Sequence, residues 1–542
     1  MSGLEKLYIM TYERRMGLAS SFRKTRFRGF SHVLLYVSRI VASFFLLFTT
    51  INVLAQQNKN YPPKDTTVIL DKTNLPIVFL NVGGVIQKDA RMIATMTIIN
   101  NTNGINYGDT LLHSSQKKDY QGLVNIKYRG NSSYSNSEKK PYSIKTVKDS
   151  IGTKQKVSLL GMGKDDDWCL LAPWNDKTLI RDVLTYTLAD GIFEYVPKIR
   201  LCELVFNGVY YGVYQLSERV RRGKERLNIE KPGTEGDALT GGYLMEIDRN
   251  DEPLVYVSKY HPQLSDGTIF YDENVYVQYK DPDYTEITDQ QKEYINSLID
   301  SFENILASDN FKDPNIGYSK FIDVNSFIDY QLTTEISNNI DGYRLSTYFY
   351  KHRDSIDPRF KMTIWDFNIA WGCSDFSNIH TGHMTDIWTY QNNDAGLGTK
   401  MPFWFERLMQ DDEYVRKLKC RYSQYRSGNY QNVNAVVDSL VYELTIGGAA
   451  DRNFKAWPSW GKYIWPNYLI SNSYEEEICY LKDWIDKRIN WLDNKLLIAN
   501  DVQHPRYSSG FEFYSLDGRR IKEPQMGIFL QRKDGRIIKI VK

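Results

Sequence analysis

The sequence predicts an α+β fold, in which a β-rich first part is followed by a helical part and a small C-terminal β unit. Alternating apolar and polar residues dominate from about residue 75 to 284, and amphipathic segments with a helical period dominate from about 285 to 500. Asp-Gly turns then separate alternating runs within residues 508–542. A chain of 542 residues is long enough for two or three domains.

The first 55 residues predict a signal peptide. A basic stretch, residues 14–39, contains no acid and leads into a 15-residue apolar run, 40–54, that ends before Gln56. This run is short for the ~20 residues of a spanning helix, so we expect export and no stable membrane span after cleavage, with an uncleaved anchor as the alternative. The protein would then be secreted, periplasmic or on the cell surface. Polar residues 56–74 predict a linker.

The β-rich part contains several predicted strands and one helix. Strands are predicted at 93–99, 124–128, 142–147 and 202–216, the last folded back at Asn207-Gly208, which is a strong hairpin signal. Residues 177–188 have the period of a helix, with Asp176 as a candidate cap.

The helical part begins with a capping box, Thr288 to Gln291, that predicts a helix to about residue 307. Further helices are predicted at 323–337, 411–425, 435–444 and 474–497. Between them, 347–351 and 361–365 predict a strand pair that would place Asp341 and Asp366 at opposite ends of one hairpin. The tail, 508–542, resembles the last strands of C-terminal sorting modules, with a plain accessory β unit as the alternative.

Two stretches about two hundred residues apart carry the candidate chemistry. The first is a polar glycine turn, Arg129-Gly-Asn-Ser-Ser133, followed by a strand that ends near Lys145. A glycine turn before a strand lysine is a layout that covers and holds nucleotide phosphates. The second contains Asp341 and Asp366, and kinases use two such aspartates as a catalytic base and a magnesium ligand.

These stretches resemble the CotH (spore coat protein H) kinase family, and the resemblance extends from about residue 75 to 421. Its other landmarks are residues 75–80, 168–182, 207–218, 242–248, 365–366 and 404–408. The resemblance implies an atypical protein-kinase-like fold of two lobes, an N-lobe at about 75–284 and a C-lobe at about 285–500. It also implies binding of ATP with Mg (or Mn) and phosphate transfer to hydroxyls of a protein substrate, with serine expected.

The family resemblance also gives each candidate residue a role. Lys145 would hold the phosphates, with Lys139 and Lys140 as alternatives, and Asp341 would accept the proton of the acceptor hydroxyl. The turn residues Arg129, Gly130, Asn131 and Ser132 would contact the phosphates. The remaining candidates are Glu218, expected to pair with the lysine, Glu246 and Asp248, expected to line the nucleotide pocket, and Asp366, Ser346 and Asn368, expected to bind the metal.

Two departures weaken the predicted metal site. Ser346 stands where kinases have an asparagine, and Asn368 stands where the family has a second aspartate. Both are neutral ligands that bind magnesium less strongly than a carboxylate. A catalytically inactive surface or structural binding protein is therefore the alternative function.

Composition and motifs exclude or weaken other classes. The net charge of +2, with no Lys/Arg stripe outside the N-terminus, gives no support for nucleic-acid binding. The sequence contains no P-loop, H-E-x-x-H or G-x-S-x-G motif. A glycosidase needs only two carboxylates, and motifs do not exclude it. Five widely separated cysteines form no C-x-x-C pair.

Overall fold

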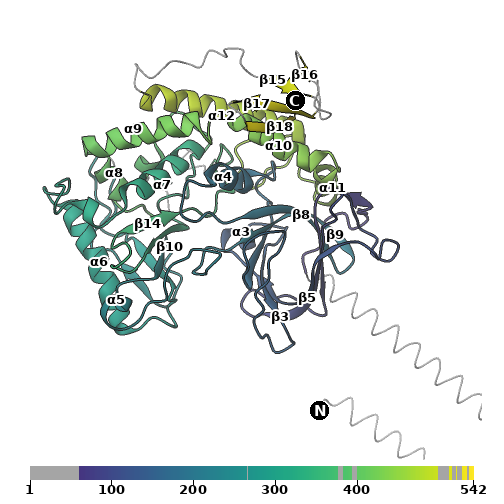
Figure 1. Ribbon diagram of the computed structural model, residues 1–542, viewed down its shortest axis with the longest axis horizontal. Coiled ribbons are helices and arrows are strands. Elements are labelled where there is room, and N and C mark those ends of the chain that lie inside the picture. The colour runs from purple at the N-terminus through teal and green to yellow at the C-terminus, as the bar shows by residue number, and fades with distance from the viewer. Residues whose placement is uncertain are drawn as a thin grey trace, which may run out of the picture. The chain divides into compact units, whose positions relative to one another are not determined.

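The computed structural model describes residues 60–264, 266–375, 382–393 and 399–497, together with the backbone of four strands between residues 512 and 541. The predicted signal peptide and residues 56–59 of the predicted linker lie outside the described residues. A search of the helices in the described part finds no segment long and apolar enough to cross a membrane. Helices and sheets are both extensive, which confirms the α+β class (Figure 1).

Seven strands close into a barrel. Its strands, in spatial order, are β2 (Ile77–Val82), β3 (Met92–Ile99), β5 (Lys118–Tyr128), β6 (Tyr142–Val147), β7 (Asp167–Leu171), β9 (Val209–Glu218) and β8 (Ile199–Phe206). Alternate residues of these strands, such as Ile126, Trp168 and Leu216, are fully buried in one core. The predicted hairpin is confirmed, because β8 and β9 join at Asn207 and Gly208, which both have positive φ.

Short elements accompany the barrel. Strand β1 (Lys72–Thr73) pairs with β4 (Asn106–Tyr107), helix α3 (Ser132–Ser135) follows β5, and helix α4 (Arg181–Ala189) follows β7. Helix α4 begins later than predicted because Leu179 has a positive φ of 67°, which a helix cannot contain. The N-cap of α4 is therefore Ile180 and not the predicted Asp176, although the Asp176 carboxylate accepts the backbone N–H of Thr178 at 3.0 Å and of Arg181 at 2.8 Å.

A second, five-stranded antiparallel sheet has the order β11 (Val255–Val257), β12 (Tyr276–Asp281), β10 (Tyr243–Asp248), β13 (Thr347–Lys351), β14 (Phe360–Thr363). Strands before residue 284 thus share a sheet with strands after residue 341. The predicted β13–β14 pair is confirmed, but its two aspartates do not lie at opposite ends. Antiparallel pairing of Tyr348 with Thr363 places the segment before β13 and the segment after β14 at the same end.

The helices of the described part pack on this second sheet, on one another or on the barrel (Figure 1). They are α5 (Gly236–Leu239), α6 (Asp289–Ala307), α7 (Val324–Ser337), α8 (Trp404–Leu408), α9 (Asp412–Ser427), α10 (Val433–Thr445), α11 (Ala449–Ala456) and α12 (Tyr474–Leu496), with 3-10 turns at Tyr318–Lys320 and Thr389–Gln391. The predicted capping box at Thr288 is confirmed, and the side chains of Asp323 and Asp411 also cap their helices. Helix α7 packs on β14, and α4 packs on both β8 and α7, so α4 connects barrel and helices.

The tail contains a four-stranded antiparallel sheet in the order β16 (Arg520–Ile521), β15 (Glu512–Tyr514), β17 (Ile528–Lys533), β18 (Arg536–Val541). A sorting role for this sheet stays a prediction.

The five cysteines are all unpaired, so none of them forms a disulfide.

Candidate active site

A cavity of about 1180 Å³ is lined by residues of the barrel on one side and of the five-stranded sheet and its loops on the other. Most predicted site residues contribute to its wall. They are Arg129, Gly130, Asn131, Ser132, Lys145, Glu246, Asp248, Asp341, Ser346, Asp366 and Asn368. Residues more than two hundred positions apart in the sequence therefore meet at one place, as the candidate chemistry requires.

The glycine turn closes one side of the cavity. Gly130 has φ = 84°, and a Cβ at this position would lie 2.0 Å from Ser133 Oγ, so the tight turn requires glycine. The amide of Asn131 donates to Asp251 Oδ2 at 2.8 Å, which links the turn to the loop after β10. The Arg129 guanidinium lies over the ring of Trp365, 5.5 Å from its centroid. The turn is thus held against the segment that carries Asp366.

Lys145 on β6 lies in the cavity wall, and its ammonium group has a carboxylate partner. Its Nζ is 3.6 Å from Asp167 Oδ2, and Arg219 lies 3.5 Å from the same oxygen. Burial lowers the pKa of Lys145, while Asp167 acts in the opposite direction. The alternatives, Lys139 and Lys140, are not among the lining residues. Lys139 is fully buried, where it donates to Val213 O and to Asn453 Oδ1, and burial lowers its pKa to about 7.

Glu218 corrects one expectation, because it neither lines the cavity nor pairs with Lys145. Its carboxylate is buried against the Arg226 guanidinium at 2.8 Å and also accepts the backbone N–H of Gly163 at 2.8 Å. Successive residues of a strand point to opposite faces. Glu218 lies on the same face of β9 as the core residue Leu216, whereas Gln215 lies on the other face and lines the cavity.

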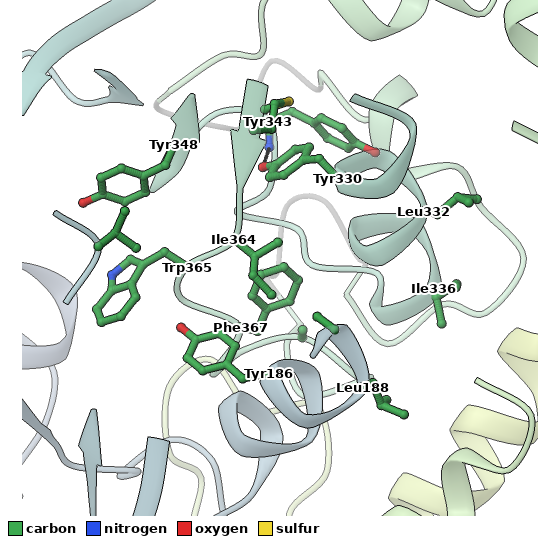
Figure 2. Close-up of a cluster of buried hydrophobic side chains, with 14 of the residues drawn as sticks. Tyr186, Leu188, Tyr330, Leu332, Ile336, Tyr343, Tyr348, Ile364, Trp365 and Phe367 are labelled. Atoms are coloured by element: carbon green, nitrogen blue, oxygen red, sulfur yellow. Dashed lines mark hydrogen bonds between the residues drawn. The ribbon is translucent and has the colours of Figure 1, made fainter. Parts of the chain in front are cut away.

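Asp366 occupies an unusual and well-braced position directly after β14. Its φ is 63°, in the left-handed region that non-glycine residues rarely adopt. Two side chains of α4 accept the backbone N–H groups here: Tyr186 Oη accepts that of Asp366 at 3.1 Å, and Asp182 Oδ1 accepts that of Phe367 at 2.7 Å. Figure 2 shows Tyr186 beside Trp365 and Phe367 in the buried cluster that supports this loop.

Carboxyl groups lie close together at this loop, and their pKa values are raised. Burial raises the pKa of Asp366 to about 6, with Asp341 raising it further and Arg129 opposing the shift. Burial, followed by the charge of Asp366, raises the pKa of Asp182 well above its ordinary value. These neighbouring carboxylates disfavour one another's ionised form, and a cation between them would relieve the repulsion.

Asp341 and Ser346 lie in the loop before β13. An Asp341 oxygen is 2.6 Å from the guanidinium of Arg344, whose Nε donates to Ile340 O at 2.8 Å, so the carboxylate is held in one orientation. Ser346 has φ = 49°, and its backbone N–H donates to Asp248 Oδ2 at 3.1 Å. Burial, and then the charge of Glu246, raise the pKa of Asp248 to about 7.

Glu246 on β10 faces the cavity with a partner of its own. Lys280 on β12 lies 2.9 Å from its carboxylate.

Metal ligands are not preassembled around these acids: among the described residues, no three His, Cys, Asp or Glu side chains are grouped closely enough to hold an ion.

Several cavity residues were not identified from the sequence. Lys127 lies two residues before Arg129, so strand alternation could have indicated it. Arg91, Asp182, Tyr186, Arg219 and Arg344 reach the cavity from loops and helices that show no local signal.

A comparison with curated proteins finds none that matches this chain. A comparison with family models matches residues 126–492 to the family described as CotH kinase protein. The matched range covers most of the chain and includes the glycine turn, Lys145, Asp341 and Asp366, whose meeting in one cavity has just been described. The chain is therefore a member of the CotH kinase protein family.

Proposed function

We propose that this protein transfers the γ-phosphate of ATP to hydroxyl groups, chiefly of serine, on a protein substrate. One observation carries the proposal: Lys145, Asp341 and Asp366, the three residues expected to act on one nucleotide, all line the same cavity. Had the two aspartates faced different sides of the sheet, a shared nucleotide site would be impossible.

The distribution of charge supports a ligand that carries both phosphates and a cation. The barrel wall contributes the basic residues Arg91, Lys127, Arg129, Lys145 and Arg219. The five-stranded sheet and its loops contribute the acids Glu246, Asp248, Asp341 and Asp366, together with the basic residues Arg249, Lys280 and Arg344. Lys and Arg bind phosphates, and carboxylates bind divalent cations. A metal–nucleotide complex would therefore meet groups that bind each of its parts in this one cavity.

Magnesium, or manganese in its place, fits the carboxylates of this cavity. Mg²⁺ in phosphotransferases takes one or two carboxylates, and phosphate and water oxygens complete its octahedron, so a preassembled protein cage is not required. Asp366 is the residue that would hold it, with Asn368 and Ser346 as neutral oxygen donors. When bound, the ion would neutralise negative charge on the transferring phosphoryl group.

The protein's own groups would position the acceptor. The hydroxyl oxygen of the acceptor forms the new bond to the γ-phosphorus, the bond from that phosphorus to the β–γ bridging oxygen breaks, and ADP leaves. Asp341 would orient the hydroxyl and take its proton onto a carboxylate oxygen. Its contact with Arg344 at 2.6 Å supports this role, because a fixed carboxylate loses less entropy when it aligns the acceptor.

The proposal extends to the architecture and the location of the protein. The barrel would act as the N-lobe of an atypical kinase, and the second sheet with its helices as the C-lobe. The protein would be exported, which requires phosphorylation before export or a phosphate donor other than cytoplasmic ATP.

A catalytically inactive binding protein is the second candidate. The neutral donors Ser346 and Asn368 favour it, because each replaces a stronger metal ligand of active kinases.

Transfer of labelled γ-phosphate with Mg²⁺ or Mn²⁺, onto the protein itself and onto a serine-rich protein, tests the proposal. We expect labelling by the unaltered protein and its loss in Asp366→Ala and Asp341→Asn. Asp483→Asn is the matched control, since Asp483 is an exposed carboxylate on α12. Equal absence of labelling in all variants, with nucleotide binding retained, would instead establish the binding protein.

A further inference from the structure

The basic residues of the barrel wall fall into two groups that differ in their partners. Lys145 and Arg219 share the buried carboxylate of Asp167, at 3.6 and 3.5 Å, and Arg221 reaches the same oxygen at 3.9 Å. Three cations therefore already surround one acid. The lysine that holds the phosphates in kinases is itself paired with a carboxylate, so the pair with Asp167 is compatible with the role expected of Lys145.

Arg91, Lys127 and Arg129 form the second group, which we call the unpaired basic group. Within the described part of the chain, none of the three forms an ion pair with a carboxylate. Lys127 makes no side-chain hydrogen bond to any described residue either, although it is only half exposed. The ammonium group, carried on a partly buried side chain in the cavity wall, is therefore available to a ligand.

Arg91 and Lys127 lie together because of strand geometry, and Arg129 lines the same cavity just beyond the end of β5. Ser143 lies opposite Lys127 in the β5–β6 register, and Arg91 donates to this same Ser143, to Oγ at 2.7 Å and to the carbonyl at 3.2 Å. A further bond from Arg91 to Asn125 O at 3.0 Å fixes the guanidinium beside Lys127.

Repulsion among the basic side chains at this place is only partly offset by nearby acids. Burial lowers the pKa of Lys127, and Arg91, Arg219 and Lys145 lower it further, while Asp89 acts in the opposite direction. Burial also lowers the pKa of Arg91, with Asp167 opposing the shift and Arg219 reinforcing it. A bound polyanion would remove this repulsion, as expected of a preorganised anion site.

We propose that Arg91 and Lys127, together with Arg129 of the turn, bind the polyphosphate chain of the phosphate donor beside Lys145. This deepens the proposed phosphotransferase function and rests on it for the identity of the donor. The group would contact only phosphate oxygens, so a nucleoside triphosphate and inorganic polyphosphate both fit it. The second source would suit a protein that acts outside the cytoplasm.

Calorimetric titration of the whole protein at low salt, with EDTA present, tests the site without metal or turnover. The probes are inorganic tripolyphosphate and ATP. We expect Lys127→Gln and Arg91→Gln to weaken binding about tenfold or more, as for loss of a charge-assisted hydrogen bond, and Lys127→Arg to restore most of it. Lys118→Gln, the same change at an exposed position of β5 outside the cavity, should leave binding unchanged.

The outcomes separate this proposal from the kinase function. Equal losses for ATP and tripolyphosphate would support the site with either donor, and binding of ATP alone, lost in Lys127→Gln, would support it with a nucleotide donor. Unchanged affinity in Lys127→Gln and Arg91→Gln, or a tenfold loss confined to Lys145→Gln, would overturn it. Binding without phosphate transfer would overturn the kinase function and leave the site standing. Circular dichroism and thermal unfolding of each variant exclude misfolding as the cause.

Discussion

Tyr186 and Asp366, 180 positions apart, are joined by a hydrogen bond in which the phenol oxygen accepts the backbone N–H of Asp366 at 3.1 Å. Asp182, one turn earlier on α4, accepts the next N–H, that of Phe367. Helix α4 therefore supports the left-handed backbone of Asp366 and the direction of its carboxylate. The loop conformation depends on a distant helix, and this dependence can be measured.

We predict that Tyr186→Phe weakens the binding of Mn²⁺ in the presence of nucleotide about tenfold. The variant leaves a buried N–H without an acceptor, which costs roughly 1–3 kcal/mol and lets the Asp366 loop relax. Titration followed by electron paramagnetic resonance of Mn²⁺ gives the affinity directly.

Thr185→Val is the control for Tyr186→Phe. Thr185 lies on the same helix and accepts a hydrogen bond from the Trp371 indole at 2.8 Å, but it does not contact the backbone of Asp366 or Phe367. Similar losses of Mn²⁺ affinity in both variants would mean that α4 acts only through general stability.

The glycine turn gives a second prediction. In Gly130→Ala the new methyl group meets Ser133 Oγ at 2.0 Å, and the residue must also hold φ = 84°. We expect weaker nucleotide binding together with a stability loss of about 1 kcal/mol or more from the positive φ.

Gly104→Ala separates the two effects. Gly104 also has a positive φ, of 71°, but nothing lies within 4 Å of its added Cβ. It should lose comparable stability, measured by urea unfolding, with no change in nucleotide affinity. If Gly130→Ala binds nucleotide as well as Gly104→Ala does, the turn is not part of the nucleotide site.

Patterns that depend on near neighbours predicted the fold well. The Asn207-Gly208 hairpin and the capping box at Thr288 are both local signals, and both are confirmed. Glu218 was misjudged because its role depends on which face of β9 points inward, and two strand faces cannot be distinguished without knowing what covers them.

The candidate site was predictable only where residues lie inside a motif. The turn at Arg129 and the two aspartates belong to recognisable stretches, and the structure brings them to one cavity. Asp182 and Arg91 reach that cavity through tertiary packing, from a helix and a loop whose sequences give no sign of it. The partner of Lys145 across β6 and β7, Asp167, becomes visible only once the strands are paired.

Glu218 gives a third prediction, on stability. Glu218→Ala would leave the Arg226 guanidinium buried without its carboxylate, and breaking a buried pair costs about 3–5 kcal/mol. Urea unfolding should reveal this loss. Glu413→Ala is the control, because its pair with Arg416 is exposed and contributes below about 1 kcal/mol. A small stability change in Glu218→Ala combined with a large loss of nucleotide affinity would return Glu218 to the binding site.

Glu303 on α6 gives the last prediction, on pH. The side chain is almost fully buried and accepts hydrogen bonds from the Trp404 indole and the Ser258 hydroxyl, both at 2.8 Å. Burial raises its pKa from an ordinary value of 4.5 to about 7. Folding therefore favours the protonated form: its contribution to stability is fully present below pH 4.5 and is lost as pH rises through 7.

A pKa shift of this size changes the free energy of unfolding by about 3 kcal/mol between pH values below 4.5 and above 7. We expect Glu303→Gln, which keeps the shape and cannot ionise, to remove that part of the pH dependence and to be more stable than the unaltered protein at pH 8. Because other buried carboxylates also titrate, the relevant quantity is the difference between the two unfolding free energies at each pH. Glu293→Gln, at an exposed position of the same helix, should show no such difference. A difference that stays constant from pH 4 to 8 would show that Glu303 is already ionised in the folded protein.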